Sequence, residues 1–482
     1  MLSEILDYIA DKLAASEVGA RLEMGDTAIA RAVGESVKMK FPAPEIVAED
    51  GSWVRLEDMV ARVTPISENA FEFSLELPHS VAVSDADGQP SERIDWRGGD
   101  MRGVWRADLE TFPIFHGNFH DVVLTDLSRA EVHQDGTIET ISLDQDLVEL
   151  TPGLWSGPSA LEVTKLEIQP AGEVETLFLD RLSLTSDIRD FDLPAWQALS
   201  TVMSANPVFN QEEFAADEQK LREAAEVFAT MNAGAAKSTI ALLGLQFDTP
   251  EQTLFSLQEL SLNMAYDNDA RPGEYSFGLT VSGLEQAEIT IPPEFHPRVG
   301  TLKLHLERFP IRQILTIPLR DLDASSNAGI GKYDAVFEKI VLPLIYANRT
   351  VVEFEEVSLR AASVSLTAHG RLTAEESSML GVVGNAEIEI TGLDKLITEA
   401  ARQAESGESA PEFLAMLTFA KGLGRPEINA DGEVAYIFDI LLSPAGEITI
   451  NEIPLDLLQG SGQTSLPLAQ PQHVQASVRN RI

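Results

Sequence analysis

The sequence predicts an α+β protein dominated by long, twisted antiparallel β-sheets with a groove-like surface and several covering helices. Apolar residues recur at every second position in many short runs, as in strands that present one face to a core. Tight-turn pairs such as Asp87-Gly88 and Asp135-Gly136 separate successive runs. No helical pattern intervenes between these runs, and this favours antiparallel pairing.

The first predicted region, residues 1–189, combines an N-terminal helix with antiparallel strands. The helix is expected over residues 1–33, with Ser3 as its N-cap. From Val37 to about Ile188 the pattern becomes strand-like. The clearest alternation in this region is that of Phe71, Phe73, Leu75 and Leu77.

Residues 190–237 are predicted to be a helical insertion. Asp192-Leu193-Pro194 is typical of a cap and first turn, because proline is tolerated at the first helical position. A second helix is expected to begin near Asn210 and to present one apolar face. That face would contain Phe214, Leu221, Phe228 and Met231.

Residues 238–458 are predicted to form a second β region with covering helices, and residues 459–482 a flexible tail. One helix is expected over residues 333–347, with Pro343 disturbing its regular hydrogen bonding. Further helices are expected near residues 393–423. The last hairpin should turn at Ser443-Pro444-Ala445-Gly446, which fits a type I turn.

The best-organised stretch runs from Val351 to Gln403. Its alternation slips at Glu355-Glu356 and again at Ala361-Ala362, which suggests bulges or a corner. After a second strand, the spacing changes to that of an amphipathic helix. We therefore expect Leu393, Leu396, Ile397 and Ala400 to be buried against a strand face that contains Ile388 and Ile390.

The charge of the chain restricts its partners. The formal net charge is −42, from 77 acidic and 35 basic residues, and there are no cysteines. A field of this sign repels phosphate backbones and anionic lipid headgroups, so nucleic-acid binding is disfavoured. The absence of cysteine excludes disulfides and thiolate catalysis. No apolar run approaches the ~20 residues of a membrane-spanning helix.

No motif assigns catalytic, cofactor-binding or metal-binding residues. His116 and His120 have a spacing that would suit a metal on a helix, but their surroundings predict a strand or loop, where the two side chains are too far apart. Lys237-Ser238 and Gly331-Lys332 are only fragments of a phosphate loop. We therefore expect no metal and no cofactor.

Three segments resemble an alphaproteobacterial envelope family, domain of unknown function 2125. They are Trp155-Ser156-Gly157-Pro158, residues 190–199, and the run from Asp431-Gly432-Glu433 to Leu455. The resemblance implies a periplasmic location if an export segment has been removed, and a cytoplasmic location is expected otherwise. Where the family tends to have Asn-Gly before the closing strand, this chain has Asn451-Glu452.

The expected function is that of a non-enzymatic bacterial envelope protein that binds a lipid or another hydrophobic ligand in a sheet-and-helix groove. Two alternatives remain open. One is a scaffold or assembly factor that acts through protein–protein contacts at strand edges or an acidic face. The other is a hydrolase with a dispersed carboxylate site. The expected partner is a hydrophobic ligand or a protein.

Overall fold

The structure is a computed structural model. It describes residues 21–23, 29–33, 36–41, 43–48, 50–128, 133–169, 175–204, 227, 231, 234–268, 273–286, 292–315, 337–406, 411–429 and 432–455.

Within these residues, all strands belong to one open sheet of 27 strands, and every pairing is antiparallel. The first strands are β1 Arg21–Glu23, β2 Ile29–Val33, β3 Ser36–Phe41, β4 Glu45–Val47, β5 Trp53–Leu56, β6 Met59–Pro65, β7 Ala70–Glu76, β8 Ser80–Ser84, β9 Pro90–Asp95, β10 Gly98–Arg106, β11 Thr111–Asp126, β12 His133–Asp146, β13 Val148–Thr151 and β14 Leu154–Ile168. The others are β15 Thr176–Asp192, β16 Ala235–Asp248, β17 Thr253–Asp267, β18 Gly273–Ser282, β19 Glu285–Gln286, β20 Val299–Phe309, β21 Val351–Arg360, β22 Ser365–Ala374, β23 Val382–Thr391, β24 Arg425–Ile428, β25 Val434–Leu442, β26 Ile448–Ile450 and β27 Ile453–Pro454.

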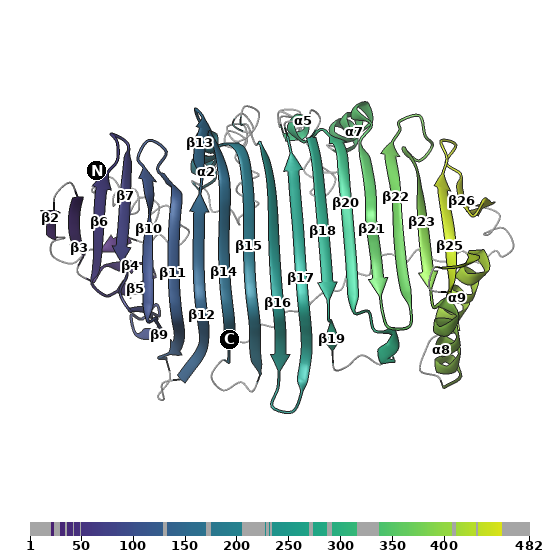
Figure 1. The fold of residues 1–482 in the computed structure, drawn as a ribbon, viewed down its shortest axis with the longest axis horizontal. Coiled ribbons are helices and arrows are strands. Elements are labelled where there is room, and N and C mark those ends of the chain that lie inside the picture. Colours follow the sequence, from purple (N-terminus) through teal and green to yellow (C-terminus); the bar gives the residue numbers. More distant parts are fainter. Residues whose placement is uncertain are drawn as a thin grey trace.

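The helices lie at the margins of this sheet (Figure 1). Near the upper edge in that view are α2 Leu193–Ser204, α5 Ile311–Leu315 and α7 Leu342–Asn348, which follows the π-helical turn η3 Phe337–Val341. At the C-terminal end are α8 Leu393–Ser406 and α9 Pro411–Leu423. A 3-10 turn, η1 Pro293–Phe295, lies between β19 and β20 in the sequence. The prediction of a mainly antiparallel protein is confirmed, although the described helices are few.

The long strands follow one another along the sheet in chain order. Each strand of the series β11, β12, β14, β15, β16, β17, β18, β20, β21, β22, β23 and β25 pairs with the next. At its other end the sheet forks at β11. One part of this strand pairs with β10, and residues 123–126 pair with β9.

Two predictions about the first half need correction. Residues 21–23 and 29–33 are strands, although the sequence pattern predicts a helix over residues 1–33. Residues 29–33 instead pair with β3, and this long-range ladder overrides the local helical spacing. Residues 1–20 lie outside the described residues.

The two ends of the predicted helical insertion, residues 190–192 and 235–237, belong to strands. Strand β15 continues to Asp192, α2 ends at Ser204, and β16 begins at Ala235. Residues 205–226 lie outside the described residues. Because β15 and β16 pair directly, the two predicted β regions lie in one continuous sheet.

The predictions for the stretch around α8 are confirmed. Leu393 and Ala400 are 1% and 3% exposed, and Leu396 and Ile397 pack in the same cluster with Ile388 and Ile390. The slip at residues 355–356 is a bulge, since the register of β21 against β22 shifts there. The second change in the alternation, at Ala361-Ala362, is the turn between β21 and β22. A hydrogen bond from the Ala361 amide to the Val364 carbonyl closes this turn.

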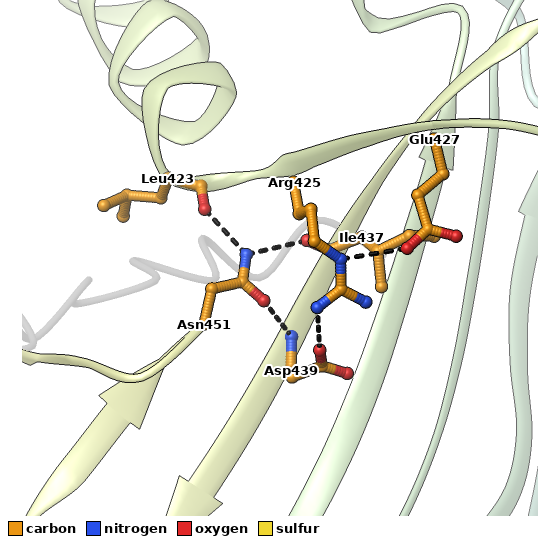
Figure 2. A network of polar contacts seen from close by, with 6 residues as sticks. All are labelled: Leu423, Arg425, Glu427, Ile437, Asp439 and Asn451. Carbon is orange, nitrogen blue, oxygen red and sulfur yellow. Dashed lines mark hydrogen bonds and ion pairs between the residues drawn. The ribbon is translucent and has the colours of Figure 1, made fainter.

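A polar network closes the C-terminal edge of the sheet (Figure 2). Strands β24 and β26 pair with different parts of β25, and Asn451 occupies the gap between them. Its side-chain amide donates to the carbonyls of Leu423 and Ile437, both at 2.8 Å, and its side-chain oxygen accepts from the Asp439 amide at 2.9 Å. Arg425 forms an ion pair with Asp439 at 2.8 Å. We call this network the C-terminal clasp.

The turn after β26 predicts the effect of one substitution. Asn451 and Glu452 have φ of 47° and 68°, and they connect the paired residues Ile450 and Ile453. Two-residue turns with positive φ at both positions favour Asn-Gly. A residue with a Cβ is strained by ~1–2 kcal/mol in the left-handed conformation, and glycine is not. Glu452→Gly should therefore raise the free energy of unfolding, measured by urea denaturation, by about 1 kcal/mol.

The matched control is Glu447→Gly. This exposed residue of the preceding turn does not have a positive φ. The added backbone freedom should therefore lower stability by about 0.5–1 kcal/mol. Equal effects of the two substitutions would contradict the strain that we assign to Glu452.

The buried end of α8 predicts a second stability difference. Leu393→Ala should lower the free energy of unfolding by about 2–5 kcal/mol, because it opens a cavity between α8 and the sheet. Leu380→Ala is the control, since Leu380 is 53% exposed and should change stability by no more than about 0.5 kcal/mol. Similar urea midpoints for both variants would show that α8 does not pack as described.

Candidate functional site

The register of the sheet places two rows of apolar residues side by side on one face. Paired residues of an antiparallel ladder point to the same side, and residues two apart on a strand share that side. The first row, from β12 to β25, is Leu143, Leu161, Leu184, Ile240, Leu262, Leu279, Leu302, Val357, Ala368, Ile388 and Phe438. The second is Ile141, Val163, Leu182, Leu242, Leu260, Val281, Gly300, Leu359, Leu366, Ile390 and Tyr436. We call these two rows the apolar band.

The band crosses the strands along the long axis of the sheet (Figure 1). Neighbouring strands lie ~4.8 Å apart, so the band extends for about 50 Å. The bulge in β21 keeps it continuous. Phe354 and Val357 are three residues apart, yet the register shift between them places both on the apolar face.

Outside its C-terminal end, the band is not covered by other parts of the described structure. Leu143, Leu184 and Leu359 are 36%, 39% and 48% exposed, and the intervening band residues are only partly buried. At the C-terminal end, by contrast, Tyr436 and Phe438 are buried beneath α8 and α9. The sheet therefore presents an open apolar surface that is closed by helices at this one end.

Polar side chains border the band on β14 to β16. On one side, Ser159, Ser186 and Ser238 occupy successive register positions, and the last two share a hydrogen bond of 2.9 Å. On the other side, Lys165 and Asp180 form an ion pair. From β17 to β21 the serine row becomes apolar, so the band widens towards the C-terminal end. The added residues are Met264, Phe277, Leu304 and Phe354.

Between the two apolar rows, the opposite face of the sheet is polar, and further along the strands it also carries apolar residues such as Leu179 and Leu257. The row that lies between the two apolar rows, on the other side, is mostly hydroxyl-bearing and consists of Ser142, Glu162, Ser183, Ala241, Ser261, Thr280, Thr301, Ser358, Thr367, Glu389 and Ile437. An ion pair of 2.8 Å joins Lys303 to Glu356 here. This hydrogen bond lowers the pKa of the Glu356 carboxyl and raises the pKa of Lys303. Both groups are largely exposed, so the pair contributes little to stability.

Two adjoining basins of about 410 and 390 Å³ lie over the polar face. Their linings share Lys237, Ala265 and Ser276, which occupy one register row of that face. A third basin of about 450 Å³ lies near Gln258 and Arg298. Each basin is lined by both polar and apolar groups, and none of them extends across the strands as the open apolar band does.

The residues of the candidate metal and phosphate motifs do not come together in a reactive site. His116 and His120 both lie on β11, and the His116 ring contacts Asp144 at 2.9 Å and Asp146 at 3.4 Å. No group of three or more metal-ligating side chains occurs in the described part of the chain. Lys237-Ser238 lies within β16, a strand, and Gly331-Lys332 lies outside the described residues.

The comparisons with known proteins add no relative. No family model, no curated protein and no solved structure matches the chain. The resemblance to the domain of unknown function 2125 family therefore stays a prediction that rests on the quoted residues. Among the described helices, none combines the length and apolar character that a membrane span requires.

Two glycines, one at the border of the band and one on β18, should differ in how substitution by alanine changes the stability of the protein. A Cβ on Gly244, which has a φ of 65°, would lie 2.2 Å from an oxygen of Asp180, whereas a Cβ on Gly278 would meet nothing nearer than 3.6 Å. Gly244→Ala should therefore lower the free energy of unfolding by about 1–2 kcal/mol or more, and Gly278→Ala should be neutral or slightly stabilising in the strand. Equal urea midpoints for the two variants would contradict the described path of β16.

Proposed function

We propose that this chain is a non-enzymatic envelope protein whose apolar band binds the acyl chains of lipids or another elongated hydrophobic ligand. The observation that carries the proposal is the continuity of the two rows, which stay apolar on every long strand from β12 to β25 and remain partly exposed outside the end that α8 and α9 cover. The periplasmic location belongs to the same proposal and rests on the family resemblance.

The size of the band supports a binding role. Two rows ~7 Å apart, with their side chains, cover a strip about 12 Å wide and about 50 Å long. About 40 Å of this length, from β12 to β22, lies outside the cover of α8 and α9. The open footprint of about 500 Å² is comparable to the largest apolar patches on ordinary monomers, which are often functional. Each apolar Å² removed from water by a ligand contributes roughly 25 cal/mol. An elongated apolar molecule would therefore gain from lying along the band.

The borders of the band support an amphipathic ligand. The hydroxyls of Ser186 and Ser238 and the charged pair Lys165–Asp180 flank the narrow part of the band. A headgroup could form hydrogen bonds at these borders while its chain lies on the leucines between them. An entirely apolar ligand would form no hydrogen bonds with these border groups, which would stay hydrated. The arrangement therefore favours molecules with a polar end.

In this proposal, helices cover one end of the band. Helices α8 and α9 pack on Ile388, Ile390, Tyr436 and Phe438, which terminate both rows. In the proposal they close the band and limit how far a chain can extend. The scaffold alternative receives less support along β25, because β24, the C-terminal clasp and β26 together occupy the outer side of this strand.

The proposal is tested by mass spectrometry of organic extracts from the purified protein, using two variants of adjacent residues. Leu184 lies in the band, and Thr185 points to the opposite face of β15. Leu184→Asp should reduce the lipid recovered per protein about tenfold, because a bound chain would desolvate the new carboxylate. Thr185→Asp adds the same charge and should leave recovery unchanged.

Two results would contradict the proposal. One is a wild-type extract without lipid, combined with no uptake of added fatty acid. The other is an equal loss of lipid in both variants, which would show that the effect comes from charge or folding rather than from the apolar face.

A further inference from the structure

Helix α9 has a second apolar face that points away from the sheet. Its inner face is formed by Leu414, Leu417 and Leu423, which pack in the cluster with Tyr436 and Phe438. On the outside, Phe413, Met416 and Phe419 are 41%, 57% and 54% exposed. These three residues are spaced i, i+3, i+6, so they form one ridge along the helix.

The outer face of α9 has few polar groups available for a protein partner. The Thr418 hydroxyl donates to the Leu414 carbonyl at 2.8 Å. Lys421, near the end of the helix, forms an ion pair with Asp394, and the hydrogen bond in this pair raises the pKa of Lys421 and lowers the pKa of Asp394. The Asp394 carboxylate also accepts a hydrogen bond of 3.0 Å from the Tyr436 hydroxyl. Glu412, which is exposed in the first turn of α9, lies one helical turn before Met416. The ridge itself is therefore apolar, with one carboxylate near its N-terminal end.

We infer that this ridge, Phe413, Met416 and Phe419, docks the protein on an electrically neutral lipid surface. A helix that lies in the interfacial region of a bilayer buries an apolar face there, and the strength of binding increases with the apolar area that it buries. A net charge of −42 opposes approach to anionic lipids, so the expected surface is zwitterionic.

A second copy of the chain fits the ridge less well. A 13-residue helix is about 20 Å long and ~10 Å wide, so the ridge can bury only about 200 Å². Stable protein interfaces bury about 800 Å² on each partner. Two chains of charge −42 would also repel each other at long range.

The position of α9 joins this surface to the apolar band. The same helix covers the ends of both apolar rows with its inner face and exposes the ridge on its outer face. In Figure 1 it lies at the C-terminal end of the sheet, beside β25. Docking through α9 would therefore bring the closed end of the band to the lipid surface. The docking itself does not require that the band binds ligand.

The test is flotation of the full chain with phosphatidylcholine vesicles. The wild-type protein should float with the vesicles, and the triple variant F413S/M416S/F419S should bind at least tenfold more weakly. The matched control is M379S/L380S/L441S, which removes apolar residues that are 81%, 53% and 53% exposed elsewhere. The control should bind within twofold of the wild type. Thermal melts of all three proteins establish that they are folded.

A second readout uses the absence of native cysteine. The variant Met416→Cys can carry one environment-sensitive dye on the ridge, and Met379→Cys carries it elsewhere. Only the dye at residue 416 should shift its emission to the blue when vesicles are added. A wild-type protein that stays unbound, a ridge variant that floats normally, or equal dye responses would overturn the inference. Concentration-dependent self-association that is abolished in the ridge variant, without vesicle binding, would also overturn it and assign the ridge to a second copy.

Discussion

The structure depends on one constraint, the continuous antiparallel pairing from β12 to β25 in a register that keeps the apolar residues on one face. In such a ladder each residue shares a face with its partner, and a slip of one residue would move a whole strand's side chains to the other face. Because the register holds across β12 to β25, the alternation within each strand adds up to rows that cross the sheet. One face thus carries the apolar band, and directly opposite the band the other face carries mostly hydroxyl and charged groups.

Local irregularities preserve this constraint. The bulge at Glu355-Glu356 corrects the phase of β21, so Phe354 and Val357 stay on the apolar side. Gly244, with its positive φ, leaves space for the Asp180 side chain at the border of the band. At the edge, Asn451 satisfies the backbone groups of Asp439 where β24 and β26 do not reach. Exposed edges invite pairing with other chains, and this side-chain capping is one way to prevent it.

The sequence predicted those features that depend on near neighbours. The packing of α8, the phase slip in β21 and the turn at Ser443–Gly446 all follow from spacings of a few residues, and the turn has the expected bond from the Gly446 amide to the Ser443 carbonyl. The prediction of a helix over residues 1–33 is wrong at residues 29–33, because this segment pairs with β3 as a strand. The band was not predicted, because its rows join residues such as Ile240 and Leu262 through a register that no local pattern reveals.

The most direct measurement of ligand position is photo-crosslinking with a fatty acid that carries a diazirine in its chain, followed by peptide mapping. If the band is the binding surface, crosslinks should concentrate on Leu184, Ile240 and Leu262, which share one register row. Their sequence neighbours Thr185, Thr239 and Asn263 point to the other face and should remain unlabelled. Crosslinks on these polar neighbours, or crosslinks confined to the basins near Lys237, would contradict binding along the apolar band.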